Sequence, residues 1–164
     1  MNDQKQQEVE RLVQTYSDTI LRLSYSYLKS VYDAEDICQT VFLKLLTAGV
    51  EFESPTHEKA YIIRATINAC KNELKAFRRK LVPLDEAREA TVQGIPSTDV
   101  LDAVMALPGK YREAIYLFYY EGYAIGEIAG LLGISPSAAA AHLSRGRKQL
   151  RIALGEAYEQ KLST

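Results

Sequence analysis

The sequence predicts an all-α protein made of two small helical domains joined by a linker. Apolar residues recur at three- and four-residue steps along most of the 164-residue chain, and no stretch shows the alternating pattern of a strand. Residues 81–97 contain two prolines and a glycine without a sustained period. Residues 122–151 have the pattern of a helix-turn-helix. We therefore expect domains at 1–80 and 98–164, with 81–97 as the linker.

Three helices are expected in the first domain. The first is amphipathic, with an apolar stripe of Val9, Leu12, Val13, Tyr16, Ile20, Leu23 and Tyr27. The second is predicted to start at Asp33 as N-cap and to end near Gly49. It buries Ile37, Cys38, Val41, Phe42, Leu45 and Leu46. Ser54 and Pro55 are the expected cap and first residue of a third helix that runs to about Lys80.

The second domain is expected to begin with a short helix, capped by Thr98 and ending at Leu107, followed by a Tyr-rich helix over about 110–120. In the helix-turn-helix, Gly133 supplies a left-handed stop, and Ser135 with Pro136 starts the second helix. An inward face is predicted for Ala139, Leu143, Gly146, Leu150 and Leu154.

Charge is segregated along the chain, although the net charge is only −1. Residues 61–82 hold six Lys/Arg against one Asp/Glu, and residues 109–164 hold seven against five. The blocks 1–60 and 83–108 are both acidic, at −4 each. Two basic blocks separated by acidic ones suggest two nucleic-acid contacts and a different partner for the acidic faces.

The third helix carries one of these contacts on the face opposite its apolar seam. An aromatic ring, amides and cations on one stripe suit locally melted nucleic acid, because they supply stacking, base-edge hydrogen bonds and phosphate neutralisation. The stripe consists of Tyr61, Arg64, Asn68, Lys71, Asn72, Lys75, Arg78 and Arg79. An ordinary solvated helix face is the alternative.

The second helix of the helix-turn-helix is expected to enter a DNA major groove. Between Glu127 and Glu156 there is no acidic residue, whereas four cations fall there. On this helix the expected DNA contacts are Ser137, His142, Ser144, Arg145 and Lys148, and Arg112 of the preceding Tyr-rich helix is expected to join them. Direct base readout should be thin, because Ala140 and Ala141 cannot donate hydrogen bonds. An ordinary helical hairpin with a basic edge is the alternative here.

Several other classes of function find no support in the sequence. Cys38 and Cys70 lie among apolar residues and are expected to be buried thiols, and His57 and His142 share no metal-ligand spacing. We expect neither a metal nor another cofactor, and no catalytic constellation. No apolar run reaches the roughly 18 to 20 residues of a membrane span, and no signal-peptide core is recognised, so a cytoplasmic location is expected.

Several motifs together resemble bacterial RNA polymerase sigma factors of the sigma-70 family, and specifically the extracytoplasmic-function group. The match covers about residues 9–154. It is carried by DAED at 33–36, YIIRATINACKNELKAFRRK at 61–80 and LDAVMALPGKYREAIYLFYYEGYAIGEIAGLLGIS at 101–135. Tyr61 replaces the usual Trp of this group, and Asn72 stands where Asp is usual.

The resemblance implies an alternative initiation subunit with no catalytic residues of its own. Core RNA polymerase, promoter DNA and an anti-sigma factor are the implied partners. Polymerase binding is implied for Asp33, Asp36, Gln39 and Thr40 on the second helix. The third helix and the loop at 50–57 would capture an unpaired base of the downstream promoter element. The helix-turn-helix would hold the upstream element.

Two other hypotheses stay open at this point. The chain could be a free-standing helix-turn-helix regulator whose amino-terminal half senses a ligand or dimerises, which requires DNA binding without polymerase. It could also be a helical interaction protein with a vestigial DNA-binding helix, which the alanine run and the near-neutral charge would suit.

Overall fold

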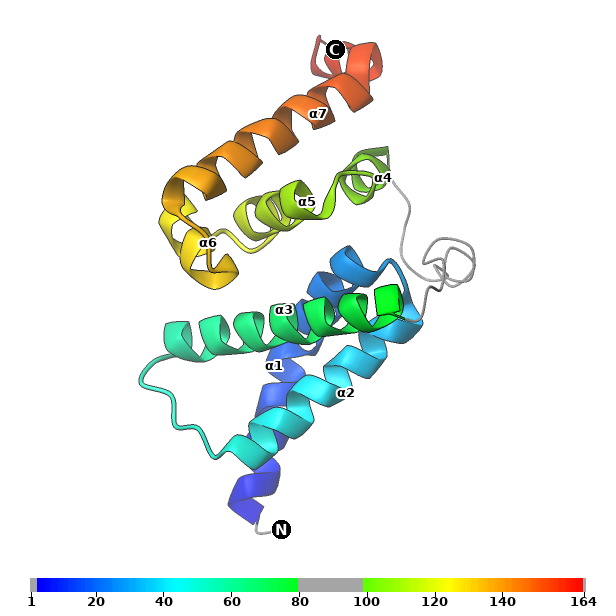
Figure 1. Ribbon diagram of the computed structural model, residues 1–164. Coiled ribbons are helices and arrows are strands. Elements are labelled where there is room, and N and C mark those ends of the chain that lie inside the picture. The colour runs from blue at the N-terminus through cyan, green and yellow to red at the C-terminus, as the bar shows by residue number, and fades with distance from the viewer. Residues whose placement is uncertain (1–2, 80–98, 164) are drawn as a thin grey trace. The chain divides into compact units, whose positions relative to one another are not determined.

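The computed structural model describes residues 3–79 and 99–163, with side chains through Gly155, and every regular element within these ranges is helical (Figure 1). The predicted all-α class is therefore confirmed. The chain divides into two compact units, an amino-terminal unit, Met1–Gln93, and a carboxyl-terminal unit, Gly94–Thr164. The expected linker and the expected cap at Thr98 lie outside the described residues.

The amino-terminal unit packs α1 (Asp3–Leu28) against both α2 (Val31–Ala48) and α3 (Pro55–Arg79), as Figure 1 shows. Its core is built from the predicted helical stripes. The largest fully buried side chains of this unit are Ile20, Leu23, Val41, Ile62, Ile63, Thr66, Ile67 and Cys70. Val13 departs from its predicted place and is 39% exposed. A wide buried face on α3 leaves its opposite side free for other contacts.

The start of α2 corrects the prediction that Asp33 is its N-cap. Ser30 has the extended backbone of a cap, and its hydroxyl oxygen accepts a hydrogen bond from the Asp33 amide at 3.1 Å. Asp33 is therefore the third residue of the first turn, where its carboxylate interacts favourably with the helix dipole. Lys29, at φ +57°, provides the turn from α1. The predicted end is confirmed, because Gly49 adopts the left-handed conformation.

The start of α3 agrees with the prediction. Ser54 accepts a hydrogen bond from the His57 amide at 3.1 Å, and Pro55 is the first helical residue. Pro fits this position because its missing amide hydrogen would have no partner in the first turn. These two residues define where the α2–α3 loop ends and α3 begins.

The carboxyl-terminal unit contains α4 (Asp99–Met105), α5 (Gly109–Ile115), α6 (Ile125–Leu132) and α7 (Pro136–Ser163). The helix-turn-helix prediction is confirmed at its turn. Gly133 has φ +68°, and Ser135 accepts from the Ala138 amide at 3.0 Å. The core gathers Val104, Leu107, Ile115 and Leu143. The inward face predicted for α7 is buried at Ala139, Leu143 and Gly146 and half-buried at Leu150 and Leu154.

The Tyr-rich helix expected over 110–120 changes its winding along its length. Residues Gly109–Ile115 are α-helical, but Tyr116–Tyr120 form a π-helical segment, η2. Its wider turn stacks the rings of Tyr116 and Tyr120 with centroids 5.3 Å apart, and the Tyr116 hydroxyl donates to Glu121. Tyr119 and Tyr120 are consequently left about half exposed on the surface. Short π-helical segments of this kind occur frequently at functional sites.

Candidate nucleic-acid interfaces

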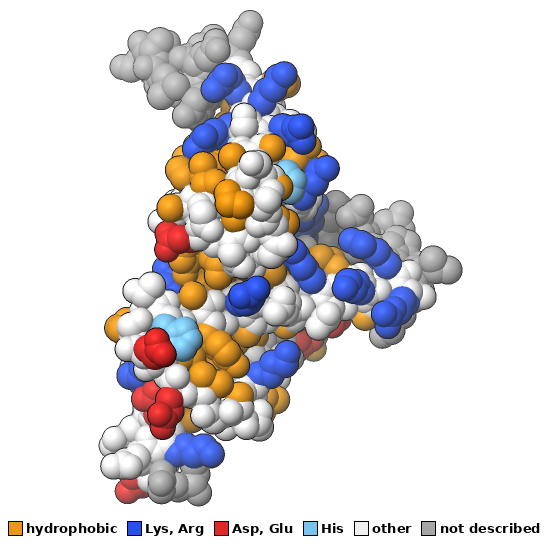
Figure 2. Space-filling view, turned by 60° about the vertical axis from the view of Figure 1, so that its left-hand side comes forward, with side chains coloured by type: hydrophobic (Ala, Val, Ile, Leu, Met, Phe, Trp, Pro, Cys, Tyr) orange, Lys and Arg blue, Asp and Glu red, His pale blue; other side chains and the backbone are white. Residues whose placement is uncertain are grey.

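The predicted polar stripe of α3 lies on its solvent-facing side. Arg64, Asn68, Asn72, Lys75, Arg78 and Arg79 are exposed, and Tyr61 and Lys71 are half-buried. Figure 2 shows Lys and Arg side chains gathered toward the carboxyl end of this helix. Because cations in the last turn also interact favourably with the helix dipole, they are stabilised before any phosphate arrives. We call these eight residues the α3 stripe.

An aromatic cluster, formed by Phe52, His57 and Tyr61, stands at the other end of the stripe. The Phe52 ring meets His57 edge-on at 5.5 Å between centroids and Tyr61 at 5.4 Å. The amide of Glu53 donates to Nδ1 of His57 at 3.1 Å. In the neutral ring this hydrogen bond leaves the proton on Nε2, so the exposed imidazole can offer an N–H donor. The cluster provides ring faces and edges beside a hydrogen-bond donor, which suits an unpaired base.

Sequence reasoning assigned no role of its own to Phe52. The signal that could have found it is a lone aromatic residue in an otherwise acidic loop between two well-capped helices. Such a residue has to bury its ring against whatever lies nearest. Here the ring lies against His57 and Tyr61, in the first two turns of α3.

A carboxylate network ties the same first turn to α1. Glu58 is only 8% exposed and accepts hydrogen bonds from both terminal nitrogens of Arg11, at 3.1 and 2.7 Å, and from the Tyr16 hydroxyl at 2.7 Å. Arg11 also donates to the exposed Glu8. The hydrogen bond from Arg11 is the main reason that the pKa of Glu58 lies below its ordinary value, against the opposing effect of burial. The network therefore holds a charged carboxylate in a nearly buried position.

The proposed polymerase-binding residues lie on α2. Asp36, Gln39 and Thr40 are exposed, whereas Asp33 is half-buried. The structure adds two apolar side chains that the sequence analysis did not single out. Tyr32 is 70% exposed and Leu43 is 62% exposed. At helical spacing, Tyr32, Asp36, Gln39 and Leu43 form one narrow stripe, which combines polar and apolar groups as protein interfaces do.

The residues of α7 that were expected to contact the upstream element differ in how exposed they are. Ser137, Ser144, Arg145 and Lys148 are exposed, and Ala140, Ala141 and His142 are half-buried. The His142 ring lies edge-on to Tyr111 of α5, with centroids 5.8 Å apart. Two hydroxyls and two cations are therefore the most accessible polar groups among the predicted α7 contacts.

Arg112 lies where the prediction of a DNA contact does not fit. It is only 8% exposed, and its Nη1 donates to the carbonyl oxygens of Met105 and Leu107, at 2.9 and 3.0 Å. These carbonyls are at the end of α4, where the helix leaves acceptors without an internal partner. Arg112 therefore caps α4 from within the unit, and its guanidinium is too buried to make the predicted DNA contact.

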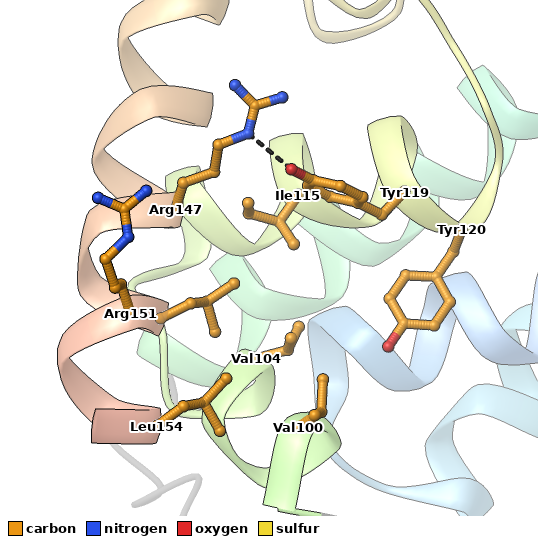
Figure 3. A pocket seen from close by; sticks show the side chains of 9 residues that line it. Val100, Val104, Ile115, Tyr119, Tyr120, Arg147, Arg151 and Leu154 are labelled. Carbon is orange, nitrogen blue, oxygen red and sulfur yellow. Dashed lines mark hydrogen bonds between the residues drawn. The ribbon is translucent and has the colours of Figure 1, made fainter. Parts of the chain in front are cut away.

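Arg147, one of the four cations counted between Glu127 and Glu156, is also held by the protein. Its Nε donates to the Tyr119 hydroxyl at 2.7 Å, and its guanidinium lies 5.0 Å from the centroid of the Phe118 ring. Figure 3 shows this hydrogen bond at the edge of a pocket of about 430 Å³. The walls of the pocket are mainly apolar, and its lining is Val100, Val104, Ile115, Tyr119, Tyr120, Arg147, Leu150, Arg151 and Leu154.

No group of three or more potential metal ligands occurs among the described residues, and none of the described helices is long and apolar enough to cross a membrane. Burial raises the pKa of the Cys70 thiol to about 12. The expected burial is confirmed for Cys70, whereas Cys38 is half-buried.

Comparison with known proteins identifies related families for both units. The family model described as Sigma-70 region 2 matches residues 12–80, and the model described as Sigma-70, region 4 matches residues 97–150. The chain is 31% identical over 131 residues to the RNA polymerase sigma factor CarQ of Myxococcus xanthus, which covers 75% of each chain.

Two further relatives are longer than the matched region. The ECF RNA polymerase sigma factor SigE of Mycolicibacterium smegmatis is 27% identical over 154 residues, which cover 87% of this chain and 60% of SigE. The protein described as probable RNA polymerase sigma factor RfaY, of Xanthomonas campestris pv. campestris, is 26% identical over 160 residues. These residues cover 89% of this chain and 40% of RfaY.

The fold also matches a solved structure, that of the sigma factor RpoE in complex with the anti-sigma factor NepR from Bartonella quintana. The TM-score is 0.71 at 20% identity, over 90% of this chain and 96% of that chain. At this identity the likeness shows a shared fold.

Proposed function

We propose, from the premise that this chain belongs to the sigma-70 family of RNA polymerase sigma factors and to its extracytoplasmic-function group, that it is an alternative initiation subunit. It binds core RNA polymerase, directs it to a subset of promoters and helps to open the DNA there. Sigma factors are specificity subunits, so the polymerase performs the chemistry and this chain needs no catalytic residues of its own. The observation that carries the proposal is the pairing of the α3 stripe with a helix-turn-helix in the second unit.

Polymerase docking is assigned to the exposed stripe of α2. The stripe holds Asp36 and Gln39, and Thr40 and Asp33 lie beside it on the same helix. Tyr32 and Leu43 flank these polar groups and remain largely exposed in the free chain. Once a partner covers them, these side chains can bury apolar surface beside the polar contacts. The same stripe can provide both affinity and specificity.

Opening of the downstream promoter element is assigned to the α3 stripe and the loop at 50–57. The aromatic cluster offers stacking surfaces, and Asn68 and Asn72 offer amide groups for base edges. The exposed cations toward the end of α3 neutralise the strand as it leaves the duplex. These groups favour the melted state, since ring faces and base edges are accessible only after unpairing.

Retention of the upstream element is assigned to α7. Arg145 and Lys148 can reach phosphates, and Ser137 and Ser144 can add neutral hydrogen bonds. His142 has less access because Tyr111 covers part of its ring. Recognition by α7 should therefore depend more on DNA shape and backbone than on base edges.

Regulation by an anti-sigma factor and a cytoplasmic location complete the proposal. The structural relatives RpoE and CnrH were solved in complex with NepR and with the cytosolic domain of CnrY, respectively. A protein that delivers RNA polymerase to promoters has to work in the compartment of the chromosome. The exposed apolar groups of α2 are surfaces that an inhibitor could cover.

Reconstitution with polymerase tests the proposed function. The purified full chain is mixed with bacterial core RNA polymerase and genomic DNA, and the 5′ ends of the transcripts are mapped. We expect new start sites that share an upstream element and that are absent with core enzyme alone. Specific DNA binding without such transcripts would instead favour a free-standing regulator. Neither binding nor transcripts would favour an interaction protein.

A further inference from the structure

The carboxylate network lies at the same turn of α3 as the aromatic cluster. Glu58 follows His57 directly and precedes Tyr61 by three residues, so the two sets share the first two turns of the helix. Glu58 faces α1 and is nearly buried, whereas His57 is exposed and contacts the loop. The first turn of α3 is thus held on one side by α1 and in contact with the loop on the other.

The loop borders a partly open pocket on its α1 and α2 side, and on its α3 side it makes two ring contacts and the Glu53–His57 hydrogen bond. A cavity of about 180 Å³ lies between α1, the end of α2 and the loop. Its lining includes Val50 and Phe52 from the loop and Glu8 and Leu12 from α1. A side chain with empty space on one side loses the contacts that would otherwise fix it. The ring contacts of Phe52 with His57 and Tyr61 tie the loop to α3.

The chemistry of the network suits a positioning role. Arg11 engages Glu58 with both terminal nitrogens, which fixes the carboxylate in angle as well as in distance. Tyr16 adds a third donor at 2.7 Å. A purely apolar contact would hold α3 against α1 equally well but would allow small rotations and shifts. A directed set of charge-assisted hydrogen bonds does not.

We propose that Glu58, held by Arg11 and Tyr16, is a positioning residue that sets the aromatic cluster of Phe52, His57 and Tyr61 for capture of an unpaired base. This inference rests on the proposed function of α3 in promoter opening. Glu58 contacts no DNA and acts through the helix turn that it holds. Its loss misplaces the cluster without altering the α2 stripe or the cations of α3.

The test compares two DNA probes with the polymerase holoenzyme. One probe is a promoter duplex, and the other is a fork junction of the same sequence with an unpaired non-template strand. The variants are Glu58→Gln, which keeps the shape but removes the charge, and Tyr16→Phe, which removes one donor. Glu8→Gln is the matched control because it removes the exposed partner of the same Arg11. Tyr61→Ala is the reference for the proposed function. Core affinity and helix content are measured for each.

The preference for the fork junction over the duplex should fall about tenfold in Glu58→Gln, the scale of a lost hydrogen bond to a charged group, and about threefold in Tyr16→Phe. Glu8→Gln should stay near wild type, and core affinity should change in none of them. If Glu58→Gln does not fold, Tyr16→Phe carries the test. Wild-type preference in both variants, with a loss in Tyr61→Ala, would overturn the positioning role alone. Wild-type preference in Tyr61→Ala would overturn the proposed function of α3 and this inference with it.

Discussion

The helices α3 and α7 both present cations to solvent, but their remaining side chains differ. On α3 the cations accompany two exposed amides and a set of aromatic rings held by the loop. On α7 they accompany two serines and the half-buried Ala140 and Ala141. Amides can hydrogen-bond to base edges and rings can stack on unpaired bases, whereas serines and cations can hold the phosphate backbone of a duplex. Under the proposed function, this difference suits α3 to unpaired bases and α7 to the duplex.

The two helices also differ in how they are supported. The first turn of α3 is tied to α1 by a nearly buried carboxylate, while α7 crosses α5 at a glycine. A Cβ atom built on Gly146 would lie 2.8 Å from Cγ1 of Ile115 and 3.4 Å from Cβ of Tyr111. The helix α3 thus adds directed hydrogen bonds to its apolar packing, whereas α7 meets α5 at a close steric crossing.

Gly146→Ala should produce the largest effect. It should destabilise the packing of α7 on α5 and leave α3 unchanged. The added methyl group forces Ile115 out of place, and overpacking of this kind costs about 1 to 3 kcal/mol. Thermal unfolding of the full chain measures the loss. Gly130→Ala is the matched control, because nothing lies within 4 Å of its Cβ, and we expect it to be neutral or stabilising. Equal stability of the two variants would contradict the tight crossing.

The double variant Asp36→Lys and Gln39→Ala should have the next largest effect and should leave α3 and α7 intact. Reversing a charge at the centre of an interface should weaken core polymerase binding by about tenfold or more. A fluorescence titration of core enzyme measures this. Asp18→Lys makes the same charge change at an exposed position of α1. A comparable loss in Asp18→Lys would mean that net charge, and not the α2 stripe, determines affinity.

Arg145→Ala and Lys148→Ala should each have a smaller effect, uniform across DNA sequences. Each lost phosphate contact should make the dependence of log affinity on log salt shallower by about one unit. Arg147→Ala is the control for this prediction, because the Arg147 guanidinium already contacts Tyr119 and Phe118 within the protein. Its salt slope should match wild type. A reduced slope in Arg147→Ala alone would reverse the assignment.

The smallest effect should be a loss of stability at low pH, caused by protonation of Glu58, which ties α3 to α1. Arg11 lowers the pKa of Glu58 below its ordinary value of 4.5, so the stabilisation by Glu58 is complete above that value and is lost as the pH falls through the lower folded-state pKa. Glu8→Gln should keep most of this acid dependence, because an exposed pair contributes only about 0.2 to 1 kcal/mol. Unfolding followed between pH 6 and 3 gives the result. Loss of the dependence in Glu8→Gln would place the titrating contact at the surface.

Local rules account for the features that the sequence predicted well. Gly133, Ser135 and Pro136 determine the turn of the helix-turn-helix through their own backbone preferences, without help from distant residues. The end of α2 at Gly49 and the start of α3 at Ser54 are determined by local signals in the same way. Such signals involve neighbours within four residues, so a single sequence contains them.

The features that the sequence did not predict depend on contacts between distant residues, or on a choice between two equally suitable residues. Residue spacing decides neither. Ser30 and Asp33 are both good N-caps three residues apart, and the hydrogen bond from the Asp33 amide decides between them. Arg112 is an ordinary surface cation by composition, but the end of α4 lies close enough to accept its hydrogen bonds. The Arg147–Tyr119 pair joins residues 28 positions apart. Tertiary packing settles each of these outcomes.

Parallel assays on one promoter would test the division of work between α3 and α7 most directly. The holoenzyme is formed with wild type, with the double variant Tyr61→Ala and Asn68→Ala, and with the double variant Arg145→Ala and Lys148→Ala. Duplex affinity and permanganate reactivity of unpaired thymines are measured for each. We expect the α3 variant to bind duplex as wild type does but to lose opening, at about 1 to 3 kcal/mol per unstacked base. The α7 variant should lose duplex affinity and open the bound fraction normally. Normal permanganate reactivity in the α3 variant would contradict the assignment of base capture to α3.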